Sequence, residues 1–192
     1  MAQAEPIRDK KQLQKLAGYW LKRGNLRNYV LIVLGVCTAL RISDLLCLKW
    51  EDVIHTRTGV FRKHITLTEK KTGKTKTIAL NKQALRALNL YFIQIGHKEE
   101  YLFKSNRKDN KPISRIQAWR IIRAAAEGIN SKVGYSCHSL RKSFGYHAWK
   151  SGTSPIMLMD IYNHTSFEIT KRYLGISQDD RDKVYLSMTL QF

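Results

Sequence analysis

The longest apolar stretch of the chain is a run of twelve residues, Tyr29–Leu40, with the sequence YVLIVLGVCTAL. A membrane-spanning helix needs about 20 apolar residues, so this run is too short to cross a bilayer and predicts a buried helix instead. A helix that is apolar on all its faces must be covered by other elements. Because 43% of the residues are hydrophobic, the chain has enough apolar side chains to provide that cover. We therefore expect one compact domain built around this segment.

The charge of the chain indicates what it binds. Lys and Arg number 34 against 15 Asp and Glu, which gives a formal net charge of +19. Such an excess favours a polyanionic partner, nucleic acid first and an anionic membrane surface second. The N-terminal residues are polar and do not form a basic-then-apolar signal segment. Three cysteines without a CxxC pair argue against a disulfide framework and fit a cytoplasmic protein.

Hydrophobic periodicity and capping residues predict a mostly helical chain. We expect helices over residues 10–22, 26–39, 43–48, 81–95, 115–126 and 139–150, and two more that begin near Ser154 and Thr165. Residues 63–80 are rich in β-branched side chains around a Thr72-Gly73 turn, which predicts a β-hairpin with a basic tip. From Val184 the apolar residues fall at every second position, which favours a strand that pairs with a sheet edge in this chain or in a neighbouring protomer.

Several common chemistries lack their sequence signatures. The chain has no Gly-rich phosphate loop ending in Lys-Ser/Thr, and its acidic residues are too scattered for a two-metal nuclease. The residues Cys137, His138, His147 and His164 match no familiar zinc-ligand spacing. We therefore expect neither a cofactor nor a metal.

Three separated segments carry basic, imidazole and hydroxyl groups that could act on a phosphate. The first holds Arg41 and Asp44, the second His138 and Arg141 on one helical face, and the third runs from His164 to Tyr173. Singly, each residue has an ordinary structural explanation, such as a surface ion pair or a core aromatic ring. An arginine fork, however, matches phosphate oxygens, and two of them can neutralise the charge of a phosphoryl transition state.

Four stretches, in this order, resemble the tyrosine recombinase (phage integrase) family. They are TALRISDLLCLKWEDV (38–53), TLTEKKTGKTKTIAL (66–80), HSLRKSFGYHAWKSG (138–152) and DIYNHTSFEITKRYLG (160–175). The resemblance extends from about residue 10 to residue 180. It implies the α+β catalytic domain of that family, which is mostly helical with a small antiparallel β-sheet, and an enzyme that recombines DNA at specific sites.

The resemblance also implies roles for single residues. Tyr173 would attack a DNA phosphodiester and form a 3′-phosphotyrosyl bond, while Arg41 and Arg141 would bind the non-bridging oxygens. His138 and His164 would assist proton transfer and hold the phosphate.

The supporting roles fall on the hairpin and its neighbours. Lys71 would protonate the leaving 5′-oxygen, with Lys70 and Lys74 as alternatives because the hairpin length varies. Asp44 would support the geometry near Arg41, and Lys70, Lys74 and Lys76 would contact the DNA backbone.

Two features depart from the family pattern. Where the family usually has Leu-Gly-His, this chain has Tyr162-Asn163-His164, so a flexible glycine is replaced. Most members also have a separate N-terminal core-binding domain, whereas we expect here only a lead over residues 1–9 and a catalytic domain over residues 10–192. The chain would then be either a short recombinase or the catalytic part of a longer integrase.

The implied partner is double-stranded DNA, with no membrane involved. Recombination further implies self-association into a tetramer on DNA, with the C-terminal tail passing between protomers, and accessory DNA-bending proteins as further partners. The implied location is the cytoplasm of a bacterium, on nucleoid DNA, for a bacterial or phage-encoded protein. Two alternatives share the same residues: a type IB topoisomerase-like DNA relaxase, and a DNA-binding protein without catalytic activity.

Overall fold

The computed structural model describes residues 4–95, 100–106, 110–176 and 178–188 of the 192-residue chain. Within these ranges the chain is mostly helical and has one small antiparallel sheet, which confirms the predicted fold class. The elements are α1 (Lys10–Leu21), α2 (Leu26–Cys37), α3 (Ile42–Leu45), α4 (Trp50–Val53), β1 (His64–Thr68), β2 (Thr75–Ala79), α5 (Lys82–Ile95), α6 (Arg115–Gly128), α7 (Cys137–Lys150), α8 (Pro155–Tyr162), α9 (Phe167–Leu174) and α10 (Gln178–Ser187).

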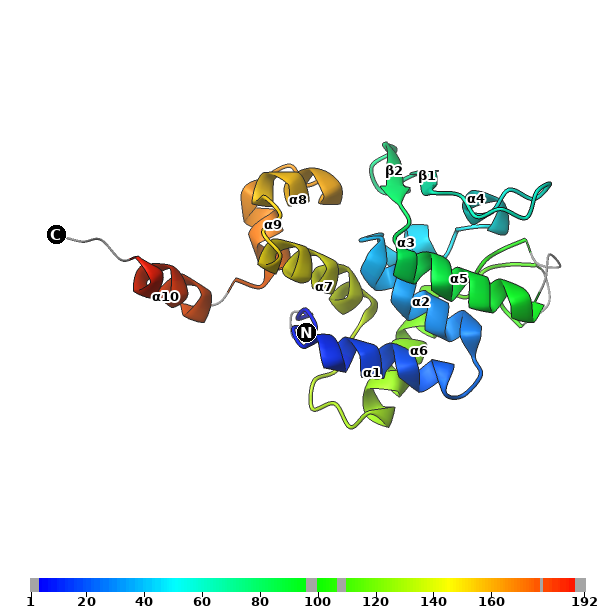
Figure 1. The fold of residues 1–192 in the computed structure, drawn as a ribbon, viewed down its shortest axis with the longest axis horizontal. Coiled ribbons are helices and arrows are strands. Elements are labelled where there is room, and N and C mark those ends of the chain that lie inside the picture. The colour runs from blue at the N-terminus through cyan, green and yellow to red at the C-terminus, as the bar shows by residue number, and fades with distance from the viewer. Residues whose placement is uncertain (1–3, 96–99, 107–109, 177, 189–192) are drawn as a thin grey trace.

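Helix α2 lies at the centre of the fold and comes from the long apolar run (Figure 1). It packs against α1, α5 and α7, so it is covered from several directions. Val30, Leu31 and Leu34 are fully buried in a large core that also includes α5 and the hairpin. Ile32 faces a second cluster with Leu16 of α1. The prediction that this run forms a buried helix is confirmed.

Strands β1 and β2 form the predicted hairpin. They pair antiparallel, with Ile65 opposite Ile78, and both of these side chains are buried in the core. Gly73 has a φ of +67°, a left-handed conformation that glycine adopts easily, and it closes the turn between the strands. Hydrogen bonds from Lys70 to Asp44 in α3 and from Lys74 to Asn163 at the end of α8 place the turn beside these two helices.

Helices α7, α8 and α9 pack against one another and make up the C-terminal part of the main body. Residues before α1 lie across α7: the Ile7 N–H donates to Ser143 Oγ at 2.8 Å, and the Ile7 carbonyl oxygen lies 2.9 Å from His147 Nε2. The Arg8 guanidinium donates to the carbonyl oxygen of Gly175 at 3.1 Å, just beyond the end of α9. The N-terminal segment therefore connects α7 to the end of α9.

The structure corrects two predictions near the C-terminus. Val184–Ser187 belong to helix α10 and not to a strand, and the last four residues of the predicted strand lie outside the described residues. The polar segment before Val184 has no β-branched residue, so a helix that starts at Gln178 continues through the short alternating pattern. Helix α9 begins one residue later than predicted, with Ser166 at its N-cap position in place of Thr165. In the described residues no helix is both long and apolar enough to span a membrane.

Candidate active site

Arg141 is the buried centre of the candidate site. It lies on α7, is only 1% exposed, and donates from Nη1 to the carbonyl oxygen of Ala39 and from Nη2 to that of Tyr162 at 3.1 Å. The guanidinium carbon also lies 4.7 Å from the centre of the Tyr162 ring. Its Nε is buried and has no hydrogen-bond partner among the described residues. Contacts from two other segments therefore hold this cation in place without a directly bonded carboxylate.

Arg41 reaches the same region from the N-cap position of α3. Its Nη1 lies 2.8 Å from Oε1 of Glu69, a fully buried residue directly after β1. Burial alone would raise the pKa of Glu69, but hydrogen bonds from Thr72 and Asn163 and the Arg41 guanidinium outweigh it and hold that pKa below its ordinary value. Glu69 was not predicted from the sequence. The only sequence feature that could have indicated it is an acidic residue between a predicted strand and a basic turn.

Tyr173 lies on α9 beside both predicted histidines. The centre of its ring is 5.1 Å from that of His138 and 4.6 Å from that of His164. The guanidinium carbon of Arg141 lies 5.8 Å from the same ring. Unlike buried Tyr162, Tyr173 is partly exposed. The structure thus brings together four residues that come from two separate sequence motifs.

His164 is held by two neighbours. Its Nδ1 lies 3.0 Å from Oγ1 of Thr170 on α9, and its ring stacks on Tyr162 with an interplanar angle of 17°. Burial, followed by the positive charges of Arg141 and Arg41 and by His138, lowers the pKa of His164 to about 4. Burial and the nearby cations Lys142 and Arg141 likewise lower the pKa of His138. Near neutral pH both rings are therefore uncharged, so each has one donor and one acceptor nitrogen.

Tyr162 packs against Arg141 and His164, and the sequence pattern did not indicate this supporting role. It is fully buried, and its hydroxyl donates to the carbonyl oxygen of Arg141 at 2.8 Å. A Cβ on Gly145 would lie 2.3 Å from that hydroxyl, so only glycine leaves room for the ring. The next residue, Asn163, has a φ of +57° and a left-handed conformation. Asparagine tolerates this conformation better than most residues, which explains how it can replace the family's usual glycine.

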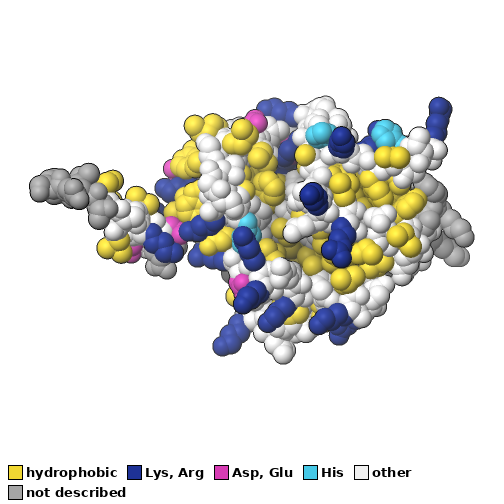
Figure 2. Space-filling model, viewed as in Figure 1, with side chains coloured by type: hydrophobic (Ala, Val, Ile, Leu, Met, Phe, Trp, Pro, Cys, Tyr) yellow, Lys and Arg dark blue, Asp and Glu magenta, His cyan; other side chains and the backbone are white. Residues whose placement is uncertain are grey.

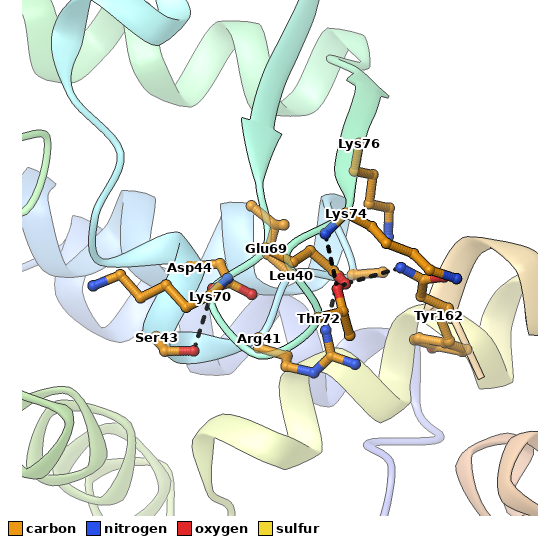
Figure 3. Close-up of polar contacts among 12 residues, drawn as sticks. Leu40, Arg41, Ser43, Asp44, Glu69, Lys70, Thr72, Lys74, Lys76 and Tyr162 are labelled. Atoms are coloured by element: carbon orange, nitrogen blue, oxygen red, sulfur yellow. Dashed lines mark hydrogen bonds and ion pairs between the residues drawn. The ribbon is translucent and has the colours of Figure 1, made fainter. Parts of the chain in front are cut away.

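The hairpin lysines point in different directions (Figure 3). Lys71 is exposed in the turn. The backbone N–H of Lys70 donates to Oδ1 of buried Asp44 at 3.1 Å, so Asp44 anchors the turn to α3. A hydrogen bond with the Cys47 thiol raises the pKa of the Lys70 amine, which extends away from Lys74 and Lys76. Lys74 donates to Oδ1 of Asn163 at 3.3 Å.

Lys76 lies inside the site, although the sequence indicated only a DNA-contacting residue. Its amine donates to the carbonyl oxygen of Ile161. Burial and the charge of Arg141 lower its pKa to about 8. A further lysine that sequence reasoning missed, Lys142, is only 3% exposed, and its amine lies 5.7 Å from the centre of the Tyr173 ring.

The electrostatics of the site are those of an anion-binding site. Arg141, His138, His164 and Lys76 all have pKa values lowered by burial and by neighbouring positive charge. Glu69 is the carboxylate that pairs with Arg41, and it does not bond directly to Arg141. An anion between the two guanidinium groups would relieve this repulsion and accept from the unpartnered Nε of Arg141. In the described part of the chain, no three His, Cys, Asp or Glu side chains are grouped to hold a metal ion.

Comparison with known proteins decides the family. The model of the phage integrase family matches residues 8–179, which is most of the chain. The chain belongs to the phage integrase family. The chain is 39% identical over 182 residues to a probable integrase/recombinase, YoeC, of Bacillus subtilis, and the match covers 94% of each chain. It is 27% identical to the tyrosine recombinase XerA of Pyrococcus furiosus, with 82% of this chain and 53% of that protein covered.

Solved structures share the fold of this chain. A crystal structure of XerA recombinase superposes with a TM-score of 0.79 at 18% identity, and the match covers all of this chain and 66% of that one. A XerH site-specific recombinase, bound to its palindromic difH substrate after cleavage, gives a TM-score of 0.74 at 18% identity, with 93% of this chain and 51% of that one covered. The chain spans nearly all of the Bacillus relative but only about half of the Xer recombinases that it matches.

Proposed function

We propose that this protein is a site-specific DNA recombinase that cleaves and rejoins DNA through Tyr173. The observation that carries the proposal is the position of a partly exposed tyrosine beside two neutral imidazoles and the buried guanidinium of Arg141. A tyrosine at such a position can attack a phosphate whose charge the arginines neutralise. The names of its relatives support the same activity.

In the proposed reaction the Tyr173 hydroxyl oxygen attacks the phosphorus atom. A bond forms between that oxygen and the phosphorus, and the bond from phosphorus to the 5′-oxygen breaks. The neutral imidazole of His138 or His164 accepts or relays the tyrosine proton, and Lys71 delivers a proton to the leaving 5′-oxygen. Arg41 and Arg141 bind the non-bridging oxygens. The phosphotyrosyl bond keeps the energy of the broken bond, so the reverse attack by a 5′-hydroxyl rejoins the strand.

The surface of the molecule supports double-stranded DNA as the partner. Lys and Arg side chains are spread widely over the face shown in Figure 2, and Asp and Glu are few on it. This pattern suits binding to the phosphate backbone, which is general and depends strongly on salt. As part of the proposal, four protomers assemble on two duplexes in the cytoplasm, on nucleoid DNA.

Trapping the covalent intermediate tests this function. A suicide substrate, with a nick that lets the short fragment carrying the released 5′-hydroxyl diffuse away, should leave the protein attached to the DNA. Tyr173→Phe should abolish the adduct, while Tyr185→Phe, at an exposed position on α10, should not affect it. An adduct that persists in Tyr173→Phe contradicts the assignment. Duplex binding without any adduct would indicate a silent DNA-binding protein. Relaxation of plasmids that lack a target site would indicate a topoisomerase.

A further inference from the structure

Asn163 is the point at which the β1–β2 hairpin meets the turn that carries His164. Its backbone caps the end of α8 in the left-handed conformation. Its side chain reaches the hairpin with both polar atoms: Nδ2 donates to Oε2 of Glu69 at 3.1 Å, and Oδ1 accepts from the amine of Lys74 at 3.3 Å. A glycine could adopt the same backbone conformation but could make neither contact.

Glu69 extends this connection to two further segments. Its Oε2 also accepts from the hydroxyl of Thr72 at 2.8 Å, and its Oε1 pairs with Arg41. One buried carboxylate thus joins the start of α3, the hairpin turn and the α8–α9 turn, as Figure 3 shows for Arg41 and Thr72. Lys76 adds a second link between the hairpin and α8 through the carbonyl oxygen of Ile161. Networks of this kind, when their members are bonded, fix the geometry of the groups between them.

Lys71 is the residue whose position this network determines. It lies between Glu69 and Thr72, which bond to each other, and directly after Lys70, whose N–H is bonded to Asp44. The backbone on both sides of Lys71 is therefore held, while its own side chain is exposed. Loss of the Asn163 contacts would leave Lys76 in β2 as the link to α8, so the turn itself would be held less firmly and Lys71 could lie farther from a phosphate bound at the two arginines.

We propose that Asn163 is a positioning residue, which holds the hairpin on the His164 turn through Glu69 and Lys74 and so places Lys71 at the 5′-oxygen that leaves during cleavage. This inference rests on the proposed function. It also gives the replacement of the family's usual glycine a role of its own in this chain.

The test compares two suicide substrates that differ in one atom. In the first the leaving atom is the ordinary 5′-oxygen, which needs a proton as its bond to phosphorus breaks. In the second this oxygen is replaced by sulfur, and because a thiol ionises with a pKa of about 8.5, the thiolate leaves without a proton donor. A defect in the placement of Lys71 should therefore appear with oxygen and disappear with sulfur.

Asn163→Gly is the informative variant, because glycine keeps the left-handed backbone and removes only the side chain. We expect about tenfold slower adduct formation on the oxygen substrate, the size expected for lost hydrogen bonds to charged groups, and the wild-type rate on the sulfur substrate. Lys71→Ala should show the same pattern with a larger loss. Asn130→Gly is the matched control, since Asn130 is also left-handed but lies in the exposed connection between α6 and α7.

Two results would overturn the inference. One is a wild-type rate for Asn163→Gly on the oxygen substrate. The other is an equal loss on both substrates, which would mean that Asn163 acts on the arginines or His164 and not on the proton donor. Failure of the proposed function is separate, because the wild-type protein would then form no adduct with either substrate.

Discussion

His164 makes the stability of the fold depend on pH. Its pKa is about 4 in the folded protein because it is buried among Arg141, Arg41 and His138, against about 6.5 for a free histidine. The unfolded chain therefore binds a proton between these two values, while the folded chain does not. The resulting stability is present above pH 6.5 and is lost as the pH falls toward 4. The pKa values of His138 and His147 are lowered by burial as well, so their contributions have the same sign.

Urea unfolding at pH 7.5 and pH 5 measures this effect. We expect the free energy of unfolding to fall between the two conditions, and His164→Gln to reduce that fall by about 1 kcal/mol, a value that allows for the half-buried position of the ring. His55→Gln, in an exposed turn, serves as the control and should leave the difference unchanged. An identical pH dependence with and without the His164 ring would show that the pKa of this ring is the same in the folded and unfolded states.

Ala39 stores backbone strain beside the same site. It is fully buried with a φ of +54°, and its carbonyl oxygen accepts from Arg141. The left-handed conformation costs a residue with a Cβ about 1–2 kcal/mol, whereas the extra flexibility of glycine in the unfolded chain costs about 0.5–1 kcal/mol. Ala39→Gly also removes a fully buried methyl group, which contributes about 0.8 kcal/mol, so it should leave the free energy of unfolding nearly unchanged in urea titrations. Ala124→Gly, within helix α6, should lower the free energy of unfolding by about 1 kcal/mol. An equal decrease in the two variants would contradict backbone strain at Ala39.

At the scale of elements, α7 and α8 are joined by a close contact between Gly145 and Tyr162. Gly18, a glycine in another helix, serves as the comparison. Gly145 in α7 leaves room for Tyr162, whereas Gly18 in α1 has no other group within 4 Å of an added Cβ. Gly18→Ala should stabilise the protein by about 0.5–1 kcal/mol. Gly145→Ala should destabilise it by about 1–3 kcal/mol, because the fully buried Tyr162 ring has little space into which to move. Thermal and urea unfolding of the two variants test this contact. If Gly145→Ala stabilised the protein as Gly18→Ala does, the close contact with Tyr162 would be excluded.

The elements also show what could be predicted from the sequence. Asp9, Asn81, Ser114 and Ser154 accept hydrogen bonds from the first turns of their helices, at or next to the helix starts that the sequence predicted. Such signals are local, so a single sequence contains them. The last part of α10, from Val184, was predicted as a strand because five alternating apolar residues do not distinguish a strand from a helix when no sheet edge is known.

The site was predictable only as far as its motifs reach. The resemblance named Arg41, His138, Arg141, His164 and Tyr173, and the structure brings them together. The supports of these residues come from other segments: Glu69 at the end of β1, Tyr162 beneath Arg141, and Thr170 beside His164. Their roles depend on tertiary contacts between distant residues, which spacing along the chain does not contain. The roles of all these residues, Lys71 included, remain predictions.

At the scale of the whole molecule, α10 is notable because its apolar side chains are not packed in the core of the domain. It extends away from the main body in Figure 1, and Val184, Tyr185, Leu186 and Met188 are 63–83% exposed. The contact between Lys150 and Asp180 ties its beginning to the end of α7. A single helix of ten residues is marginal in water without tertiary packing. Exposed apolar side chains on such a helix fit a role in which they pack on another protomer.

Replacing Tyr185 and Leu186 together with alanine tests this role of α10. Because both side chains are exposed in the single chain, the thermal midpoint of the free protein should stay unchanged. Complexes that hold two duplexes should be lost on native gels, while adduct formation on one suicide substrate persists, since Tyr173 lies outside α10. The control replaces Arg181 and Lys183, exposed polar neighbours on the same helix, with alanine. At the same salt concentration it should still form the complexes that hold two duplexes. Paired complexes formed equally well by the Tyr185 and Leu186 variant would show that these two side chains make no essential contact between protomers. A lower thermal midpoint of that variant would instead place them in contacts within one chain.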